Sequence, residues 1–267
     1  MTRKITTINK KQQKYLVTYG DGIYTKQKER LKREAEETKW FSRVFSYGRE
    51  DVEEFYQQHK NFIDSNPKGF GLWIWKPWLI RKALAQLKES DILIYCDAGV
   101  SFINVGQFKE SREKAFQDYV SLLNSSSRPI LTFAAVDYGQ SRDNKYWSKM
   151  FLLKKAGLHN DDIFLNSLQL EATVVLMKKT SFTTDFIEKW AYLTVCDNYE
   201  LTNEDSCGEK ELSEFRGHKH DQSILSVLSY KNKTHVLNGQ HLYGLSPFWA
   251  GRMTDEGKKK FYADPPL

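Results

Sequence analysis

The first residue whose type and position could serve a chemical function is an acid that ends an apolar run. In the stretch "SDILIYCDAGVSF", the apolar residues 92–96 stop abruptly at Asp97, which two small residues follow. A second carboxylate, Asp21, stands in "TYGDG" after the first apolar run, beside the flat ring of Tyr19. In open α/β sheets, ligands bind beyond the carboxyl ends of the strands, where helix N-termini offer amide hydrogens. Two carboxylates at one sheet edge therefore predict a nucleotide pocket, although each acid can also be a turn former or a helix cap.

A second polar cluster stands late in the chain. The segment "FRGHKHDQSILSVL" places His220, Asp221 and Gln222 immediately before an apolar helix. A carboxylate in that place can move a proton in catalysis, or it can cap the helix that follows. The segment "GQHLYGLSPFW" adds His241. A zinc site on the His-x-His pair is disfavoured, because no third ligand stands nearby in the sequence.

Two common nucleotide-binding motifs are missing from the sequence. The loop "KGFGLWIWKP" contains Gly-x-Gly but lacks the third glycine of the dinucleotide fingerprint, and no GxxxxGK[ST] occurs. NAD-dependent enzymes and P-loop ATPases are therefore disfavoured. The aromatic residues of this loop, Trp73 and Trp75, either form a pocket wall or pack under a helix. The remaining interpretation is a nucleotide site that depends on an acid and a metal ion.

Composition indicates a globular protein. The chain has 267 residues, 40% of them hydrophobic, and a net charge of +6. No apolar run approaches the roughly 20 residues that cross a bilayer, and the start does not resemble a secretory signal. We therefore expect a cytoplasmic protein with at most a peripheral contact at the inner face of the membrane. Basic and acidic residues alternate in "KQKERLKREAEE", which is typical of a solvated helix face and disfavours nucleic acid as a partner. Three cysteines without CxxC spacing predict neither a disulfide framework nor a zinc site.

The first half of the chain alternates short apolar runs with amphipathic ones. Strands are predicted at "KYLVTYG", "RVFSY" and residues 92–96, and helices at residues 25–38, 51–63 and 77–88, the last opened by Pro77. This βαβαβ order predicts a mainly parallel, doubly wound sheet with right-handed crossovers.

The second half has a less regular pattern. Strands are predicted at "RPILTF" and "ATVVLM", helices at residues 144–156, 181–193 and 222–230, and a polar loop with little core at residues 198–219. No repeat or linker forces a boundary, so we expect one domain over residues 1–267. Within it we expect a first half over about 13–135, a second half over about 136–250, and a tail at 251–267.

These motifs carry a resemblance to nucleotide-sugar glycosyltransferases of the GT-A fold. The sequence is similar to small bacterial and viral polysaccharide glycosyltransferases that read "GYWxWKP", "LxYxDAG" and "HxxDQS", and the likeness covers roughly residues 15–249. His241, Gly244 and Trp249 also resemble, more weakly, a metal-binding histidine motif of glycogenin-like and lipopolysaccharide galactosyltransferases. The resemblance implies an α/β fold of the GT-A type, with a Rossmann-like, mainly parallel central sheet flanked by helices. It also implies that the half at about 13–135 binds the nucleotide sugar and that the less regular C-terminal half at about 136–250 is the acceptor and catalytic half.

The resemblance also implies a reaction. The expected enzyme is a hexosyltransferase that moves galactose or glucose from a UDP-sugar to a saccharide acceptor, which can be lipid-linked, in polysaccharide or glycan synthesis. Relatives bind a divalent metal with Asp-x-Asp, but Gly99 stands here for the second aspartate. The implied ligands of Mn²⁺, or of Mg²⁺, are then Asp97 and His241. In a metal-independent alternative, Lys76 or Lys219 neutralises the diphosphate.

The implied roles fall into two groups. Asp221 is the first candidate for the general base, with Glu171 and Asp143 behind it, and Gln222 faces the sugar in retaining relatives. The choice between retention and inversion stays open. The residues implied in nucleotide-sugar binding are Thr18, Tyr19, Asp21, Trp75, Lys76, Asp97, Ala98, Gly99 and His220.

Two other functions remain as alternatives. A nucleotidyltransferase that forms sugar nucleotides should show a glycine-rich phosphate loop after its first strand, and "YGDGIYTKQKER" has few glycines there. A noncatalytic module that binds a nucleotide sugar is the other alternative, which turnover of a labelled sugar nucleotide would exclude.

Overall fold

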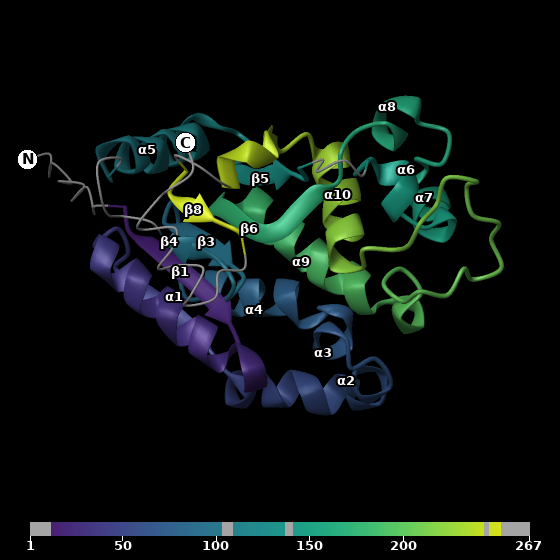
Figure 1. Ribbon diagram of the computed structural model, residues 1–267, viewed down its shortest axis with the longest axis horizontal. Coiled ribbons are helices and arrows are strands. Elements are labelled where there is room, and N and C mark those ends of the chain that lie inside the picture. The colour runs from purple at the N-terminus through teal and green to yellow at the C-terminus, as the bar shows by residue number, and fades with distance from the viewer. Residues whose placement is uncertain (1–11, 103–108, 137–140, 243–245, 252–267) are drawn as a thin grey trace, which may run out of the picture.

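The computed structural model describes residues 12–102, 109–136, 141–242 and 246–251, and a six-stranded sheet forms its centre (Figure 1). The strand order is β2-β1-β3-β6-β5-β7, and β4 and β8 form a separate two-stranded sheet. The described strands are β1 (Lys14–Tyr19), β2 (Arg43–Tyr47), β3 (Ile92–Cys96), β4 (Ser101–Phe102), β5 (Ile130–Ala134), β6 (Leu170–Lys178), β7 (His235–Leu237) and β8 (Phe248–Trp249). Apart from Gly251, the predicted tail at residues 251–267 lies outside the described residues, as does Gly244.

The direction of one strand departs from the expected order. Three of the five pairings in the six-stranded sheet are parallel, whereas β6 runs antiparallel to both of its neighbours, β3 and β5. Cys96 at the end of β3 therefore pairs with Val174, the middle residue of β6. As a consequence, the residues that open β6 lie beside those that follow β3.

Helices cover both faces of the sheet. Helices α1 (Thr25–Thr38) and α5 (Lys109–Ser125) pack on one face, and α4 (Trp75–Leu84), α9 (Ser181–Val195) and α10 (Asp221–Asn232) pack on the other. The prediction of an α/β fold with a mainly parallel central sheet flanked by helices is confirmed. The remaining α-helices are α2 (Glu53–Ser65), α3 (Gly69–Leu72), α6 (Asn144–Trp147), α7 (Met150–Ala156) and α8 (Asp162–Leu165). The described 3₁₀ turns are η1 (Gly22–Tyr24), η2 (Arg49–Val52), η3 (Asp197–Tyr199) and η4 (Gly239–Leu242).

Alternation along the strands creates two apolar cores. Leu16 and Ile94 are buried in the core under α1 and α5, whereas Val17 and Tyr95 belong to the core under α4, α9 and α10. Successive side chains of a strand point to opposite faces, so one apolar run supplies both cores. This explains why the central strands are almost continuously apolar.

Local patterns predict several elements correctly and fail at others. The helix predicted at residues 25–38 and the strand predicted at "RVFSY" match α1 and β2. Helix α4 begins at Trp75, so Pro77 is its third residue rather than its first, and the helix ends at Leu84. The helix predicted at residues 144–156 is two helices, because Ser148 and Lys149 are extended between α6 and α7. Gln169 donates a hydrogen bond to Ser148, a long-range contact that local periodicity does not reveal.

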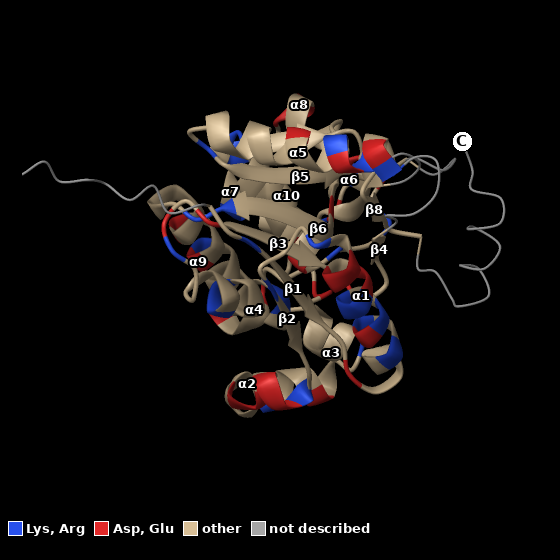
Figure 2. Cartoon of the chain, turned by 90° about the vertical axis from the view of Figure 1, so that its left-hand side faces the viewer, with Lys and Arg blue, Asp and Glu red and all other residues tan. Residues whose placement is uncertain are grey.

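The charges of α1 are less exposed than its sequence predicts. Acidic and basic residues stand side by side on this helix (Figure 2), but Arg30 and Glu34 are each 5% exposed. Their i,i+4 ion pair lies at the turn that follows β3. The helix is therefore only partly a solvated face. Within the described residues, no helix combines the length and apolarity that spanning a membrane requires.

Candidate active site

A cavity of about 280 Å³ opens at the sheet edge where β3 ends and β6 begins. It combines segments that lie far apart in the sequence: the turn before α4, the end of β3, the start of β6 and the start of α10. Its lining residues are Lys68, Trp73, Lys76, Asp97, Arg142, Glu171, Ala172, Thr173, Lys219, His220, Asp221 and Gln222. We call this cavity the inner pocket.

The ammonium group of Lys76 lies between two carboxylates of the inner pocket. Its Nζ is 3.3 Å from Asp97 Oδ1 and 3.2 Å from Asp221 Oδ2. It also donates a hydrogen bond to the carbonyl oxygen of Ala172 at 3.1 Å. Lys76 and Asp221 are both 3% exposed. The buried cation of Lys76, on α4, thus contacts the end of β3, the strand β6 and the start of α10.

The glycines of "KGFGLWIWKP" fold the turn that delivers Lys76. Gly69 and Gly71 have φ angles of 60° and 80°, in the left-handed region that glycine adopts without steric strain. A Cβ atom on Gly69 would lie only 2.4 Å from the ring of Trp73. The indole of Trp75 donates to the carbonyl oxygen of Gly69 at 2.9 Å and is otherwise buried in the core. Of the two tryptophans, only Trp73 lines the pocket. The loop therefore supplies one tryptophan to the pocket wall and packs the other in the core.

Burial and charge together set the protonation of this trio. Burial opposes the charge on Lys76, but Asp221 and Asp97 outweigh it, so the pKa of the lysine is raised. Burial also raises the pKa of Asp221 to about 6, with Lys76 opposing the rise and Asp97 adding to it. Asp221 therefore titrates close to neutral pH, where a general base is most effective.

A tight turn fixes Asp97 at the end of β3. Its backbone N–H donates to the carbonyl oxygen of Thr173, and the hydroxyl of Tyr95 donates to its Oδ1 at 2.6 Å. Arg30 donates to the carbonyl oxygens of Ala98 and Val100 at 3.1 Å and 2.9 Å. Neither Ala98 nor Gly99 lines the pocket. Their observed role is to form the turn that presents the Asp97 carboxylate.

A buried amide orients Gln222. Gln222 Nε2 donates to Gln169 Oε1 at 3.0 Å, and Gln169 Nε2 in turn donates to the hydroxyl of Ser223 at 2.9 Å. Gln169 is 1% exposed. The Gln222 amide is therefore held at the pocket wall beside Asp221. Sequence reasoning missed Gln169, which stands two positions before Glu171 in a segment without a motif.

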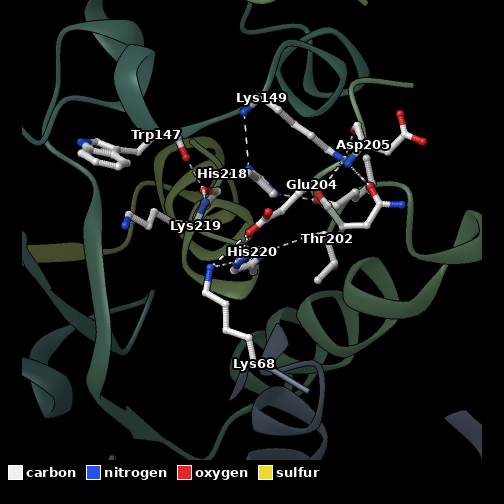
Figure 3. Close-up of polar contacts among 12 residues, drawn as sticks. Lys68, Trp147, Lys149, Thr202, Glu204, Asp205, His218, Lys219 and His220 are labelled. Atoms are coloured by element: carbon white, nitrogen blue, oxygen red, sulfur yellow. Dashed lines mark hydrogen bonds and ion pairs between the residues drawn. The ribbon is translucent and has the colours of Figure 1, made fainter. Parts of the chain in front are cut away.

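His220 occupies the pocket wall next to α10 (Figure 3). Its Nδ1 is 2.9 Å from the carbonyl oxygen of Thr202, and its Nε2 lies 3.4 Å from both Glu204 Oε1 and Lys68 Nζ. Burial lowers the pKa of His220, which keeps the imidazole neutral at pH 7. Its φ of 50° makes it the residue that turns the chain into α10, so Asp221 is the first helical residue and not the N-cap.

The predicted polar loop at residues 198–219 is anchored by buried groups (Figure 3). Lys149 is 1% exposed, and its Nζ donates to the carbonyl oxygens of Asn203 and Asp205 at 3.0 Å and 2.9 Å. His218 Nε2 lies 2.9 Å from the carbonyl oxygen of Leu201. The histidines of the His-x-His motif thus contact backbone carbonyls and hold the loop against the pocket. The loop has more buried structure than its composition predicts.

Several residues predicted for nucleotide-sugar binding do not line the inner pocket. Thr18 is fully buried in β1, and the ring of Tyr19 packs on Trp75 with centroids 4.4 Å apart. The hydroxyl of Tyr19 donates to Asp21 Oδ2 at 2.9 Å. A role of Tyr19 and Asp21 in base binding stays a prediction. Asp143 precedes α6 and is also absent from the lining of the pocket.

The side chains around Asp97 do not fit the predicted manganese site. His241 does not line the pocket. Its Nδ1 lies 3.1 Å from the hydroxyl of Tyr119 on α5, whereas Lys76 comes from α4 on the opposite face of the sheet. A divalent ion on Asp97 would lie against the buried Lys76 ammonium, and like charges repel strongly where water is excluded. Over the described residues, no three His, Cys, Asp or Glu side chains form a group that could hold a metal.

Positive charge gathers around the same cavity. Lys68, Arg142 and Lys219 line it together with Lys76, against the carboxylates of Asp97, Glu171 and Asp221. Burial and neighbouring cations lower the pKa of Lys219, which a bound anion would counteract. Lys68 and Arg142 were not among the predicted site residues: Lys68 only opens the loop "KGFGLWIWKP", and Arg142 stands in no motif. This arrangement can bind a diphosphate and still keep a carboxylate next to it.

Two glycosyltransferases are among the solved structures to which this chain is similar. No family model matches the chain, and no curated protein matches it. The apo form of mouse xyloside xylosyltransferase 1 aligns with a TM-score of 0.41 and 10% identity, over 86% of each chain. The apo form of the glycosyltransferase GlyE of Streptococcus pneumoniae aligns with a TM-score of 0.40 and 15% identity, over 96% of this chain and 52% of that one.

Proposed function

We propose that this chain is a glycosyltransferase of the GT-A type that transfers a hexose from a UDP-sugar to a saccharide acceptor. The observation that supports it most is the buried Lys76 ammonium between Asp97 and Asp221, in a cavity at the sheet edge where α/β proteins bind nucleotides. Galactose or glucose as the sugar, and polysaccharide or glycan synthesis as the process, belong to the proposal through the sequence resemblance.

The cationic side chains stabilise the leaving group. Sugar transfer breaks the bond between the anomeric carbon and a phosphate oxygen, so negative charge grows on the departing UDP. Lys76 is held in place by two carboxylates and is shielded from water, and preorganised charge in such a site is most effective in the transition state. Lys68, Arg142 and Lys219 complete the positive side of the pocket. These groups perform the charge compensation that the metal performs in the Asp-x-Asp relatives.

Asp221 accepts the proton of the acceptor. As the acceptor hydroxyl oxygen bonds to the anomeric carbon, its proton moves to the carboxylate, whose pKa of about 6 leaves it ionised at pH 7. Gln222, oriented by Gln169, contacts the sugar from the same helix start. In an inverting enzyme Asp221 carries the main role, whereas in a retaining enzyme Gln222 does. The anomeric configuration of the product, measured by NMR, distinguishes the two.

A panel of sugar nucleotides tests the function. Purified protein is incubated with UDP-glucose, UDP-galactose and their GDP and CMP counterparts, with EDTA and with Mn²⁺, and the released nucleotide is quantified. Release of UDP from a UDP-hexose that Asp221→Asn abolishes supports the proposal. Formation of pyrophosphate from UTP and a sugar phosphate would instead indicate a nucleotidyltransferase. Binding without turnover of any donor, with or without oligosaccharides as acceptors, would indicate a noncatalytic module.

A further inference from the structure

A second and larger cavity lies between α2 and the 3₁₀ turn η3. Its volume is about 650 Å³, within the range of roughly 300–1,000 Å³ that is usual for small-ligand sites. Six of its eleven lining residues carry amides, namely Gln57, Gln58, Asn61, Asn66, Asn198 and Asn203, and the others include Phe62, Tyr199 and Lys60. We call it the amide pocket. None of the residues implied by the sequence motifs belongs to it.

The chemistry of the amide pocket suits neutral sugar rings. A primary amide both donates and accepts hydrogen bonds, as a pair of neighbouring sugar hydroxyls also does. Within the described residues, the side-chain amides of Gln58, Asn61 and Asn198 have no hydrogen-bond partner, and all three residues are exposed, so these amides are available to a ligand. No acidic residue lines the pocket, and its Lys60 is paired with Asp64 at 2.6 Å. The ligand that matches this lining is polyhydroxylated and uncharged.

An aromatic pair provides a rigid wall. The rings of Phe62 and Tyr199 stack with centroids 3.8 Å apart and an interplanar angle of 15°. His59 Nδ1 lies 2.8 Å from the hydroxyl of Tyr199, so the ring is fixed from a second side. Asp197, Asn198 and Tyr199 all have φ angles between 47° and 64°, three consecutive non-glycine residues in the left-handed region. Such strain persists only where surrounding contacts enforce it.

Two short chain segments connect the amide pocket with the inner pocket. Asn66 of the amide pocket precedes Lys68 of the inner pocket by two residues, and Asn203 is followed directly by Glu204. Glu204 Oε1 lies 3.1 Å from Lys68 Nζ and 3.4 Å from His220 Nε2, and Figure 3 shows these three side chains together. The exposed Lys68–Glu204 ion pair therefore joins the two segments that connect the cavities. A chain of sugar units in the amide pocket can extend from there toward Asp221.

We propose that the amide pocket binds a neutral oligosaccharide, and, resting on the proposed function, that this oligosaccharide is the acceptor whose free end reaches the inner pocket. The class of substrate is then an uncharged glycan of several units rather than a lone monosaccharide, a protein or a charged lipid. The amides select the hydroxyl pattern, while Phe62 and Tyr199 form the wall against which the sugar rings lie.

Glycan-array binding of the full-length protein provides the test. The double variant Gln58→Ala/Asn61→Ala removes two exposed amides from α2, where alanine favours the helix. Gln117→Ala, an exposed amide on α5 outside the pocket, is the matched control. Wild type and control should bind the same neutral glycans, and the double variant should bind them at least tenfold more weakly, because two hydrogen bonds are lost. Binding of no neutral glycan, or equal binding by the double variant, overturns the inference.

A UDP titration of the same proteins separates this inference from the proposed function. The double variant should bind UDP as wild type does, which also shows that it is folded. If glycans bind at the amide pocket but no protein binds UDP, the proposed transferase function fails while the saccharide site stands. If UDP binds and glycan binding is unchanged in the double variant, the transferase function stands and the amide pocket is not a saccharide site.

Discussion

Replacing Asp221 by Asn isolates the proton acceptor of the proposed reaction. Asparagine keeps the size of the side chain and its place at the start of α10 but cannot take the proton. If Asp221 is the base, turnover should fall by about 10² to 10⁴, the usual scale for losing general base catalysis. Lys76 retains Asp97 and the carbonyl oxygen of Ala172 as partners, so the pocket keeps its cation.

The pH dependence of the wild type gives a second, quantitative signature. With a pKa of about 6, Asp221 is ionised to roughly 90% at pH 7 and roughly 10% at pH 5, so kcat/KM should fall about tenfold between them. Initial rates of UDP release at low donor concentration measure this profile. The pH profile of the residual activity of Asp221→Asn should lack the fall near pH 6 (the acid limb), whereas the profile of Glu171→Gln should keep this limb.

Two outcomes would refute this assignment. One is an Asp221→Asn variant that keeps more than a tenth of the wild-type rate. The other is a limb near pH 6 that persists in Asp221→Asn and disappears in Glu171→Gln, which would move the base to Glu171. A folding control accompanies both.

Thermal stability provides that folding control, and the direction in which it changes with pH follows from the pKa of Asp221. The pKa of Asp221 is higher in the folded chain than in the unfolded one, so the folded chain binds the proton more tightly between about pH 4 and 6. The free energy of unfolding therefore falls as pH rises through that window. A rise from 3.8 to about 6 corresponds to at most about 3 kcal/mol. Asp221→Asn should thus show a Tm at pH 8 that equals or exceeds that of the wild type.

Three further predictions concern the surroundings of Asp221. Lys76→Met should weaken UDP binding, measured by calorimetry, and should lower the free energy of unfolding by about 3–5 kcal/mol, because two carboxylates lose a buried partner. An unchanged UDP affinity in a folded variant would argue against the charge role of Lys76. EDTA should leave UDP binding and turnover unchanged, and a requirement for Mn²⁺ would contradict the absence of a metal role. Arg30→Met should lower activity, because the turn after Asp97 loses the hydrogen bonds that Arg30 donates to it, whereas Arg33→Met on the same helix should leave activity unchanged. Equal activity of both variants would show that the turn forms without Arg30.

The sequence predicted the elements whose signals are local. Helix α1 and strand β2 match because an amphipathic period and a β-branched and aromatic run suffice to specify them. The direction of β6 was not predictable, since the pattern of an apolar strand is the same in both directions. The break at Ser148 was equally hidden, because Ser148 accepts a hydrogen bond from Gln169, which is 21 positions away in the sequence.

The candidate site was predictable where motifs mark it. Lys76, Asp97 and Asp221 each stand in a motif, but only the fold shows that one ammonium group joins the two acids. Lys68 and Arg142 contribute charge from loops, and no sequence signal distinguishes them from ordinary surface cations. His241 was assigned from resemblance alone, and the structure places it against Tyr119.

A crystal structure of the protein with UDP tests the central claim most directly. The account predicts that oxygens of the diphosphate lie within hydrogen-bonding distance, about 3 Å, of Lys219 or Arg142 in the inner pocket, with the Lys76 ammonium deeper in the same pocket. Asp221 and Gln222 should face the open end of the pocket next to the β-phosphate. A diphosphate bound elsewhere on the protein, or one bridged to a metal ion on Asp97 and His241, would contradict the account.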